Sequence, residues 1–259
     1  MIDIQYIVAG AMTGLVVGLT GVGGGALMTP ILLLFFGVPP TTAIATDLWF
    51  AALTKIAGAF IHHRSGQVDW QVVKRLWAGS LPSALVIVVL VSSGAIITKL
   101  DWLTRAISLL ILITALGLFF APKLSRLATQ RRVSSPNQFK ALQPALTVTS
   151  GGLLGICVSL TSVGAGALGS LLLLYLYPLR MTPHKLVATD IVHAIPLALV
   201  AGVGYLIAGK VDGQMLMNLL LGSVPMVIIG SYLTKQFSSR TLQLLLGCIL
   251  LLVALKLIA

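Results

Sequence analysis

The chain carries little charge. Only 9% of its 259 residues are Asp, Glu, Lys or Arg, and only 6 of these are acidic. A soluble domain normally contains about 25% charged residues, and no polar stretch between the apolar runs is long enough to form one. Hydrophobic residues make up 58% of the chain, and the mean hydropathy is +1.05. The composition therefore predicts an integral membrane protein.

The chain also lacks the residues that an enzyme needs. It has 4 histidines, two of them adjacent at His62 and His63, and no grouping of metal ligands. It has no nucleophile motif such as G-x-S-x-G and no phosphate-binding P-loop. The two cysteines, Cys157 and Cys248, lie inside apolar runs, where a buried structural thiol is the usual role. We therefore expect no catalytic residue, no metal and no cofactor.

Two further segment types are absent. The N-terminus has no basic region and no small-residue cleavage site, so we do not predict a signal peptide. The net charge is +11, but the 17 Lys and Arg residues lie mostly in short loops and form no stripe. Basic residues in such loops are typical of orientation signals in membrane proteins. Nucleic acid is therefore not an expected partner.

Long apolar runs fill the chain and predict helical membrane crossings, each about 20 residues long. The first run, 4–38, would be about 52 Å long as one straight helix, which is too long for a single crossing. It is interrupted by "LTGVGGGALMTP", in which glycines disfavour a helix interior. The run therefore divides into two shorter helices at this cluster. The remaining runs are 42–61, 73–91, 103–121, 146–177, 186–208, 215–233 and 242–258.

The second half of the chain repeats the first. At an offset of 141, "LTGVGGGAL" matches "LTSVGAGAL", and at 143 "ATD", "GQVD" and "GSLP" match "ATD", "GKVD" and "GSVP". Four landmarks in one order indicate two copies of one membrane unit. We predict a first repeat over 1–121, a basic cytoplasmic linker over 122–143 and a second repeat over 144–259. The fold class is all-α, each repeat being a glycine-broken helix pair plus three transmembrane helices.

If each broken pair enters and leaves on one face, the second repeat is inverted relative to the first. This arrangement puts 12 Lys and Arg on one face and 4 on the other, with Lys55 inside a helix. If each broken run crosses once instead, the distribution becomes 10 against 6. The positive-inside rule therefore favours two inverted repeats. The four residues on the less basic face are Lys99, Arg105, Lys210 and Lys256.

Inverted repeats with broken helices are typical of secondary transporters, whose site lies near the midplane. Helices beginning near Ala26 and at Ala167 would present free N–H groups and a positive dipole end to an anion. The alternative is that small residues serve close helix packing. The candidate substrate-binding residues are Thr20, Gly21, Gly23, Gly24, Gly25, Thr161, Ser162, Gly164 and Gly166.

These motifs resemble the TauE/SafE family of sulfite exporters, a group of bacterial membrane permeases. The resemblance rests on "GLTGVGGGALMTPIL", its echo "SLTSVGAGAL", the paired "ATD" and the two four-segment halves, and it extends over essentially the whole chain. Ser162 and Ala165 stand where the first motif has Gly21 and Gly24. The resemblance implies transport of sulfite, sulfonates or related organosulfur anions across the bacterial inner membrane.

Two acids occupy matched positions in the apolar runs. Asp47 and Asp190 each follow a threonine, and His193 lies three residues after Asp190 on the same helix face. A charged acid in a membrane interior is costly, so these residues are candidates for proton coupling. The alternative is a structural acid that hydrogen-bonds a helix end. For Lys55, snorkelling toward His62 and His63 is favoured over attraction of an anion inside the bundle.

The sequence thus predicts a secondary transporter for a small anion, working by alternating access with proton coupling. A passive anion channel lined by the same glycine turns is the alternative. The expected partners are the anionic substrate and the lipid bilayer, and a homo-oligomer stays open. The exact anion, the direction of transport and the coupling ion are not specified by these patterns.

Overall fold

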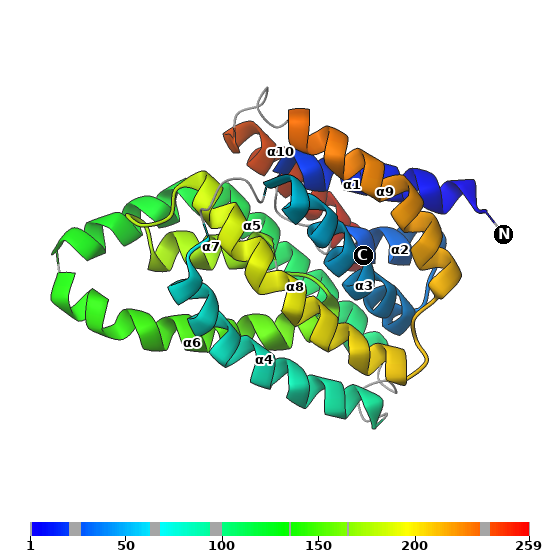
Figure 1. The fold of residues 1–259 in the computed structure, drawn as a ribbon, viewed down its shortest axis with the longest axis horizontal. Coiled ribbons are helices and arrows are strands. Elements are labelled where there is room, and N and C mark those ends of the chain that lie inside the picture. The colour runs from blue at the N-terminus through cyan, green and yellow to red at the C-terminus, as the bar shows by residue number, and fades with distance from the viewer. Residues whose placement is uncertain are drawn as a thin grey trace.

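The computed structural model describes residues 2–20, 27–62, 68–93, 100–134, 136–164, 166–233 and 239–258, and these ranges contain helices and no strand. Figure 1 shows them as one bundle. The helices are α1 (Ile4–Thr20), α2 (Met28–Phe36), α3 (Pro40–His62), α4 (Trp70–Ser92), α5 (Leu100–Ser134), α6 (Pro136–Thr161), α7 (Ala167–Leu176), α8 (Pro183–Ile207), α9 (Gly213–Leu233) and α10 (Ser239–Ile258).

Both long opening runs are split, as predicted. The first run forms α1 and the short helix α2, and the second forms α6 and the short helix α7. Gly37 ends α2 in the left-handed conformation, with φ of 61°, and its N–H bonds back to the Leu32 carbonyl. Thr182 begins α8 by accepting a hydrogen bond from the Lys185 N–H, and Pro183 follows it at the first helical position.

Six helices within the described ranges are long and apolar enough to cross a membrane: α4, α5, α6, α8, α9 and α10. The predicted crossing at 42–61 forms α3, which is not among these six and which contains the polar residues Asp47 and Lys55. Both of these side chains are buried. Many large apolar side chains instead lie exposed on the outer helices, as a lipid environment requires.

The predicted linker region is helical in the structure. Residues 122–134 continue α5, and residues 136–143 begin α6. Helices of the two halves also pack against each other, since α1 contacts α9 and α6 contacts α4 (Figure 1). The two sequence repeats, which residues 122–143 separate along the chain, therefore pack together in one helical bundle.

The contact of α1 with α9 and the contact of α6 with α4 lie at positions that the offsets of 141 and 143 relate to each other. The Gly10 Cα faces the backbone of Leu219 so closely that a side chain there would collide with it. At the matched positions, Gly151 meets the backbone of Leu76 in the same way. Glycine at these positions therefore lets the helix backbones approach directly, as small residues do in membrane helix pairs.

The equivalent helices α3 and α8 run antiparallel. Trp49 near the middle of α3 donates from Nε1 to the Gly202 carbonyl, 3.1 Å away. Farther along α3, Lys55 contacts Asp190, which lies earlier in α8. Since sequence offset 143 relates these two helices, their opposite directions support the prediction of an inverted second repeat.

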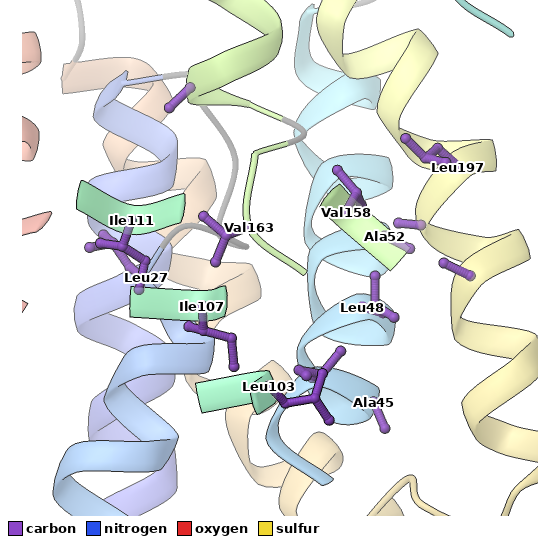
Figure 2. Packing of buried hydrophobic residues seen from close by; sticks show 14 of the residues in the cluster. Leu27, Ala45, Leu48, Ala52, Leu103, Ile107, Ile111, Val158, Val163 and Leu197 are labelled. Atoms are coloured by element: carbon purple, nitrogen blue, oxygen red, sulfur yellow. The ribbon is translucent and has the colours of Figure 1, made fainter. Parts of the chain in front are cut away.

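The main apolar core lies between these central helices and their neighbours. Figure 2 shows Leu48 of α3, Leu103 and Ile107 of α5 and Leu197 of α8 among the buried residues of this cluster. The core therefore includes apolar side chains from both α3 and α8, which pack against each other.

Candidate functional site

The first glycine cluster, the largest group of candidate binding residues, lies outside the described residues. This applies to Gly21, Gly23, Gly24 and Gly25, and also to Ala165 in the second turn. Their role as substrate ligands stays a prediction. At the edge of the first turn, Thr20 Oγ1 donates a 2.8 Å hydrogen bond to the Val16 carbonyl one helical turn earlier.

The second turn is described up to Gly164 and again from Gly166. Thr161 Oγ1 donates to the Cys157 carbonyl at 2.7 Å and accepts from the Val163 N–H at 3.1 Å. Ser162 and Gly164 both have positive φ, 58° and 114°. The backbone thus reverses sharply here, and Ser162, a residue with a Cβ, adopts the left-handed conformation that glycine favours. Its hydroxyl is buried without a hydrogen-bond partner in the described part of the chain.

Asp47 caps the half-helix α2 from another helix. Its Oδ2 accepts a 3.1 Å hydrogen bond from the Thr29 N–H and a 2.5 Å bond from the Thr29 hydroxyl. Asp47 is fully buried, and its Oδ1 makes no hydrogen bond within the described ranges. A negative side chain at this end of α2 matches the positive end of the helix dipole. The structural role considered for Asp47, bonding to a helix end, is therefore present.

Asp190, at the matched position, has a different partner. Lys55 Nζ lies 3.3 Å from Asp190 Oδ2, and the two side chains are 4% and 1% exposed. The favoured interpretation that Lys55 snorkels outward is therefore wrong. The ammonium group stays in the bundle because a carboxylate from α8 faces it there.

Asp190 also lies against the first turns of the half-helix α7. A Cβ on Gly169 would lie 2.5 Å from Asp190 Oδ1. Each matched acid therefore meets the beginning of the short helix in its own repeat. Across the described residues, no hydrogen bond or ion pair joins Asp47 to Asp190.

His193 does not pair with Asp190 in the described structure. A 3.0 Å hydrogen bond joins its Nε2 to Ser80 Oγ of α4, and its backbone carbonyl accepts from Trp77 Nε1 at 3.2 Å. The ring is fully buried, and Nδ1 has no partner among the residues described. The geometry thus shows a histidine held by α4, with one ring nitrogen directed away from Ser80.

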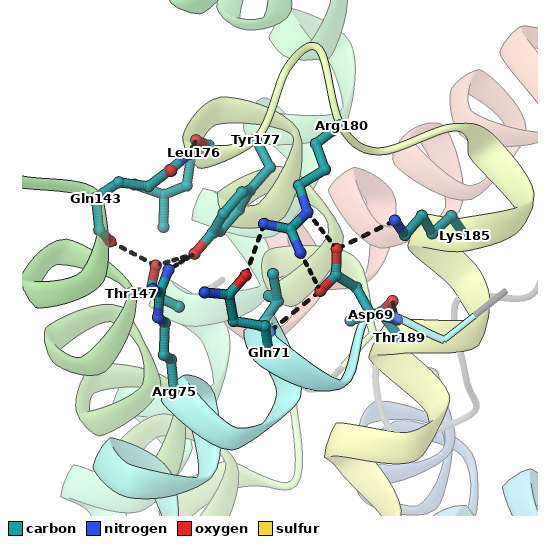
Figure 3. Close-up of polar contacts among 11 residues, drawn as sticks. Asp69, Gln71, Arg75, Gln143, Thr147, Leu176, Tyr177, Arg180, Lys185 and Thr189 are labelled. Carbon is teal, nitrogen blue, oxygen red and sulfur yellow. Dashed lines mark hydrogen bonds and ion pairs between the residues drawn. The ribbon is translucent and has the colours of Figure 1, made fainter. Parts of the chain in front are cut away.

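A second polar cluster, which sequence reasoning missed, lies at the end of the bundle where α4 begins (Figure 3). The buried Asp69 caps α4 and forms ion pairs with Arg180 Nε at 2.5 Å and Lys185 Nζ at 3.2 Å. Arg180 also donates to Gln71 at 2.9 Å. Burial raises the pKa of Asp69, but hydrogen bonds from Lys185 and Arg180 outweigh it and hold the pKa below its usual value.

Beside this ion cluster, a Tyr177 hydroxyl joins three elements. It lies 2.8 Å from Thr147 Oγ1 of α6 and accepts a 3.3 Å bond from Arg75 of α4 (Figure 3). At the matched place in the other half, Tyr6 instead stacks on Phe36, with ring centroids 4.5 Å apart. The two ends of the molecule therefore differ chemically even though the helices repeat. Within the described ranges, no group of three His, Cys, Asp or Glu side chains is arranged to hold a metal ion.

Comparison with known proteins agrees with this architecture. A sequence profile described as Sulfite exporter TauE/SafE matches residues 6–257. A probable membrane transporter protein of Bacillus subtilis, YjnA, is 37% identical over 99% of this chain and 100% of its own length. Another from Bacillus subtilis, YdhB, is 27% identical over 88% of this chain and 87% of its own. A probable membrane transporter protein of Haemophilus influenzae is 29% identical over 62% of this chain and 58% of its own. No solved structure gives a significant match.

Proposed function

Because this chain belongs to the sulfite exporter TauE/SafE family, we propose that it is a secondary transporter for a small sulfur-containing anion: sulfite, a sulfonate or a related organosulfur anion. That it is a multi-pass membrane transporter with bacterial relatives follows from the family and from its apolar helices. The proposal adds the identity of the anion, the alternating-access mechanism and the coupling to protons. The proposal assigns no catalytic residue, cofactor or metal to the chain.

The observation that carries the proposal is a buried polar centre beside both helix breaks. Asp47 meets the first turn of α2, and Asp190 meets the first turns of α7. Polar groups of this kind are expensive inside a membrane bundle and are typical of ion and substrate pathways. In transporters with broken helices, such a centre is where substrate and coupling ion bind.

The proposed mechanism is alternating access around this centre. The glycine turns supply backbone N–H groups to the anion, together with hydroxyls of Thr20, Thr161 and Ser162. The candidate proton carriers are Asp47, Asp190 and His193. The antiparallel packing of α3 and α8 supports alternating access, because two equivalent helices of opposite direction can exchange environments between the two open states.

The purified protein in liposomes tests the proposal. Uptake of labelled sulfite, thiosulfate and ethanesulfonate should saturate with concentration and should show counterflow, in which unlabelled anion inside drives label inward. A passive channel gives neither behaviour, so linear uptake without counterflow would identify the channel alternative. Thermal stabilisation by the same anions, with acetate as comparison, identifies the ligand independently, because a ligand of the folded state raises the midpoint.

A homo-oligomer and the native lipid partners belong to the same proposal. The exposed apolar side chains on the outer helices support contact with a bilayer, and nucleic acid stays excluded as a partner in this proposal. The mass of the protein in detergent micelles, measured by light scattering, tests the oligomeric state.

A further inference from the structure

The buried Lys55 and Asp190 pair is an incomplete ion pair. An ammonium has three donors and a carboxylate has about four acceptor sites. One 3.3 Å contact joins the two groups, and Asp190 Oδ1 has no partner in the described part of the chain. A pair kept only for stability would need its remaining groups satisfied by further hydrogen bonds. Among the residues that the structure describes, Lys55 is therefore a buried cation with unused donor capacity.

The ion pair of Lys55 with Asp190 also has no counterpart at the matched positions of the other repeat. The residue equivalent to Lys55 in the second half is Ala198, and the described partner of Asp47 is the uncharged Thr29. The centre thus contains two matched acids but one lysine. If that lysine binds substrate, the molecule has one cationic anchor and holds one anion per cycle.

We propose that Lys55 is the counterion of the transported anion and that the ionised Asp190 takes the anion's place when the site is empty. This inference rests on the proposed function. Binding of the anion displaces the Asp190 carboxylate from Lys55, and Asp190 then takes up a proton. On release of the anion, the proton leaves and the internal pair forms again. One proton accompanies each anion.

Charge neutrality explains why this exchange couples the two movements. The empty pair is neutral, and so is a protonated Asp190 with Lys55 and a monovalent anion. An anion bound without the proton leaves one net negative charge in the membrane, and a proton bound without the anion leaves one net positive charge. Uncompensated charge in the bilayer interior is strongly unfavourable. Only the two neutral forms therefore reorient readily, and the favoured substrate is a monovalent oxyanion such as a sulfonate.

The neighbouring helices bring few other charges to this pair. On α8 itself, His193 lies one turn from Asp190, and its ring bonds to Ser80 of α4. On α3, Asp47 bonds to Thr29 of α2. On α4, Lys74 is exposed, Arg75 bonds to Tyr177, and Asp69 binds Arg180 and Lys185 at the helix start. The half-helix α7 contains no charged residue. The titratable residues of α6 are the exposed Lys140 near its start and the half-buried Cys157 near its end.

The test compares four proteins in liposomes: wild type, Asp190→Asn, Lys55→Met and the double variant Lys55→Met/Asp190→Asn. The probe for the pH series is ethanesulfonate, a monovalent anion whose charge does not change with pH, and sulfite and thiosulfate are compared with it for transport by the wild type. Wild-type affinity should weaken about tenfold for each pH unit once Asp190 ionises, because each bound anion requires one proton. The affinity of Asp190→Asn should not vary with pH and should equal the wild-type value at low pH.

The double variant separates an anchor from a structural pair. It removes both charges, so no uncompensated charge is buried, and it should insert and melt near the wild-type temperature. Its affinity for the probe should fall at least tenfold. A double variant with wild-type affinity and pH dependence would show that the pair is structural and would overturn the inference. If the double variant does not insert, pH-dependent affinity in Asp190→Asn overturns it instead.

Two further measurements complete the test. Asp212→Asn is the matched control: it changes an exposed acid that caps α9 through the Met215 N–H, and an amide caps as well as a carboxylate. It should keep wild-type pH dependence. Ethanesulfonate uptake by the wild type should not respond to an imposed membrane potential, and a clear response would contradict neutral exchange. Failure of the wild type to transport any of the three probes refutes the proposed function itself, whereas transport that is independent of Lys55 and Asp190 refutes only this inference.

Discussion

The backbone N–H of Asp69 donates a 3.1 Å hydrogen bond to Thr189 Oγ1, the side chain next to the central Asp190 in α8. The same contact recurs in the other half, where the Asp212 N–H donates to Thr46 Oγ1 at 3.4 Å, next to Asp47. The threonine just before each central acid thus contacts the start of a helix from the opposite repeat: Thr189 contacts the start of α4, and Thr46 contacts the start of α9. This crossing pattern ties the acids in the core to the two ends of the bundle.

The ion pair of Asp69 with Arg180 brings the loop before α4 and the loop before α8 to one end of the molecule. We therefore expect cysteines introduced at Gly66, Arg131, Arg180 and Ser238 to face the cytoplasm, as the charge distribution predicts. Labelling of intact cells with a membrane-impermeant maleimide, in a background without Cys157 and Cys248, measures this. Labelling from outside at Arg180 or Ser238 but not at Gly66 would contradict the inverted arrangement.

Asp69→Asn should lower the free energy of unfolding at neutral pH by about 1 kcal/mol, because its partners Arg180 and Lys185 are partly exposed and screened. The pKa of Asp69 is lower in the folded state, so its contribution is present above the unfolded pKa and is lost as pH falls through the folded value. The difference between variant and wild type should therefore begin to shrink as the pH falls below about 4, the pKa of an unperturbed Asp, and should vanish only below the lower pKa of the folded state. Thermal melts across pH measure it, and a difference that persists in acid would exclude the ion pair as its cause.

Gly155→Ala should destabilise the packing of α6 on α4, because the added Cβ would collide with the Ser80 backbone carbonyl. Overpacking of this kind costs about 1–3 kcal/mol. Gly152→Ala is the control on the same helix, since its Cβ would lie 3.3 Å from the Ser83 hydroxyl and at an ordinary contact distance of 3.8 Å from the Gly79 carbonyl oxygen. Melting temperatures in detergent compare the two. Equal effects would show that helix propensity, not backbone contact, governs both positions.

Asp47→Ala should destabilise the protein more than Asp47→Asn. Alanine leaves the buried Thr29 N–H and hydroxyl without the carboxylate that accepts from them, at a cost of about 1–3 kcal/mol. The asparagine amide oxygen can still accept a hydrogen bond from Thr29. Unfolding midpoints of the two variants test this order, and equal midpoints would mean that the negative charge, which both variants remove, stabilises α2 more than the hydrogen bonds from Thr29 do.

Gly24→Ala should weaken transport strongly while the protein stays folded in the membrane. This prediction comes from the sequence, because a Cβ restricts positive φ and holds an anion away from the backbone. The matched residue is already Ala165, so Ala165→Gly should have a mild effect. Uptake kinetics of the two variants, measured at equal expression, test this expected difference. Wild-type affinity in Gly24→Ala would assign the glycines to helix packing and move the site elsewhere.

The sequence by itself determined the class of protein and the plan of each repeat. Hydropathy specifies membrane helices, glycine disfavours a helix interior, and both act locally, so the breaks after α1 and α6 are visible in the residues themselves. The offsets of 141 and 143 likewise identified the matched positions Asp47 and Asp190 without a structure.

Only the tertiary structure decided what each matched residue contacts. Lys55 lies 135 positions from Asp190, and no local pattern links them. Their contact depends on α3 packing antiparallel against α8, which is a consequence of how the two repeats dock. The same docking joins Asp69 to Arg180, 111 positions apart. Local propensities repeat with the sequence, whereas side chains at the interface differ between halves, so Asp47 caps a helix while Asp190 holds a lysine.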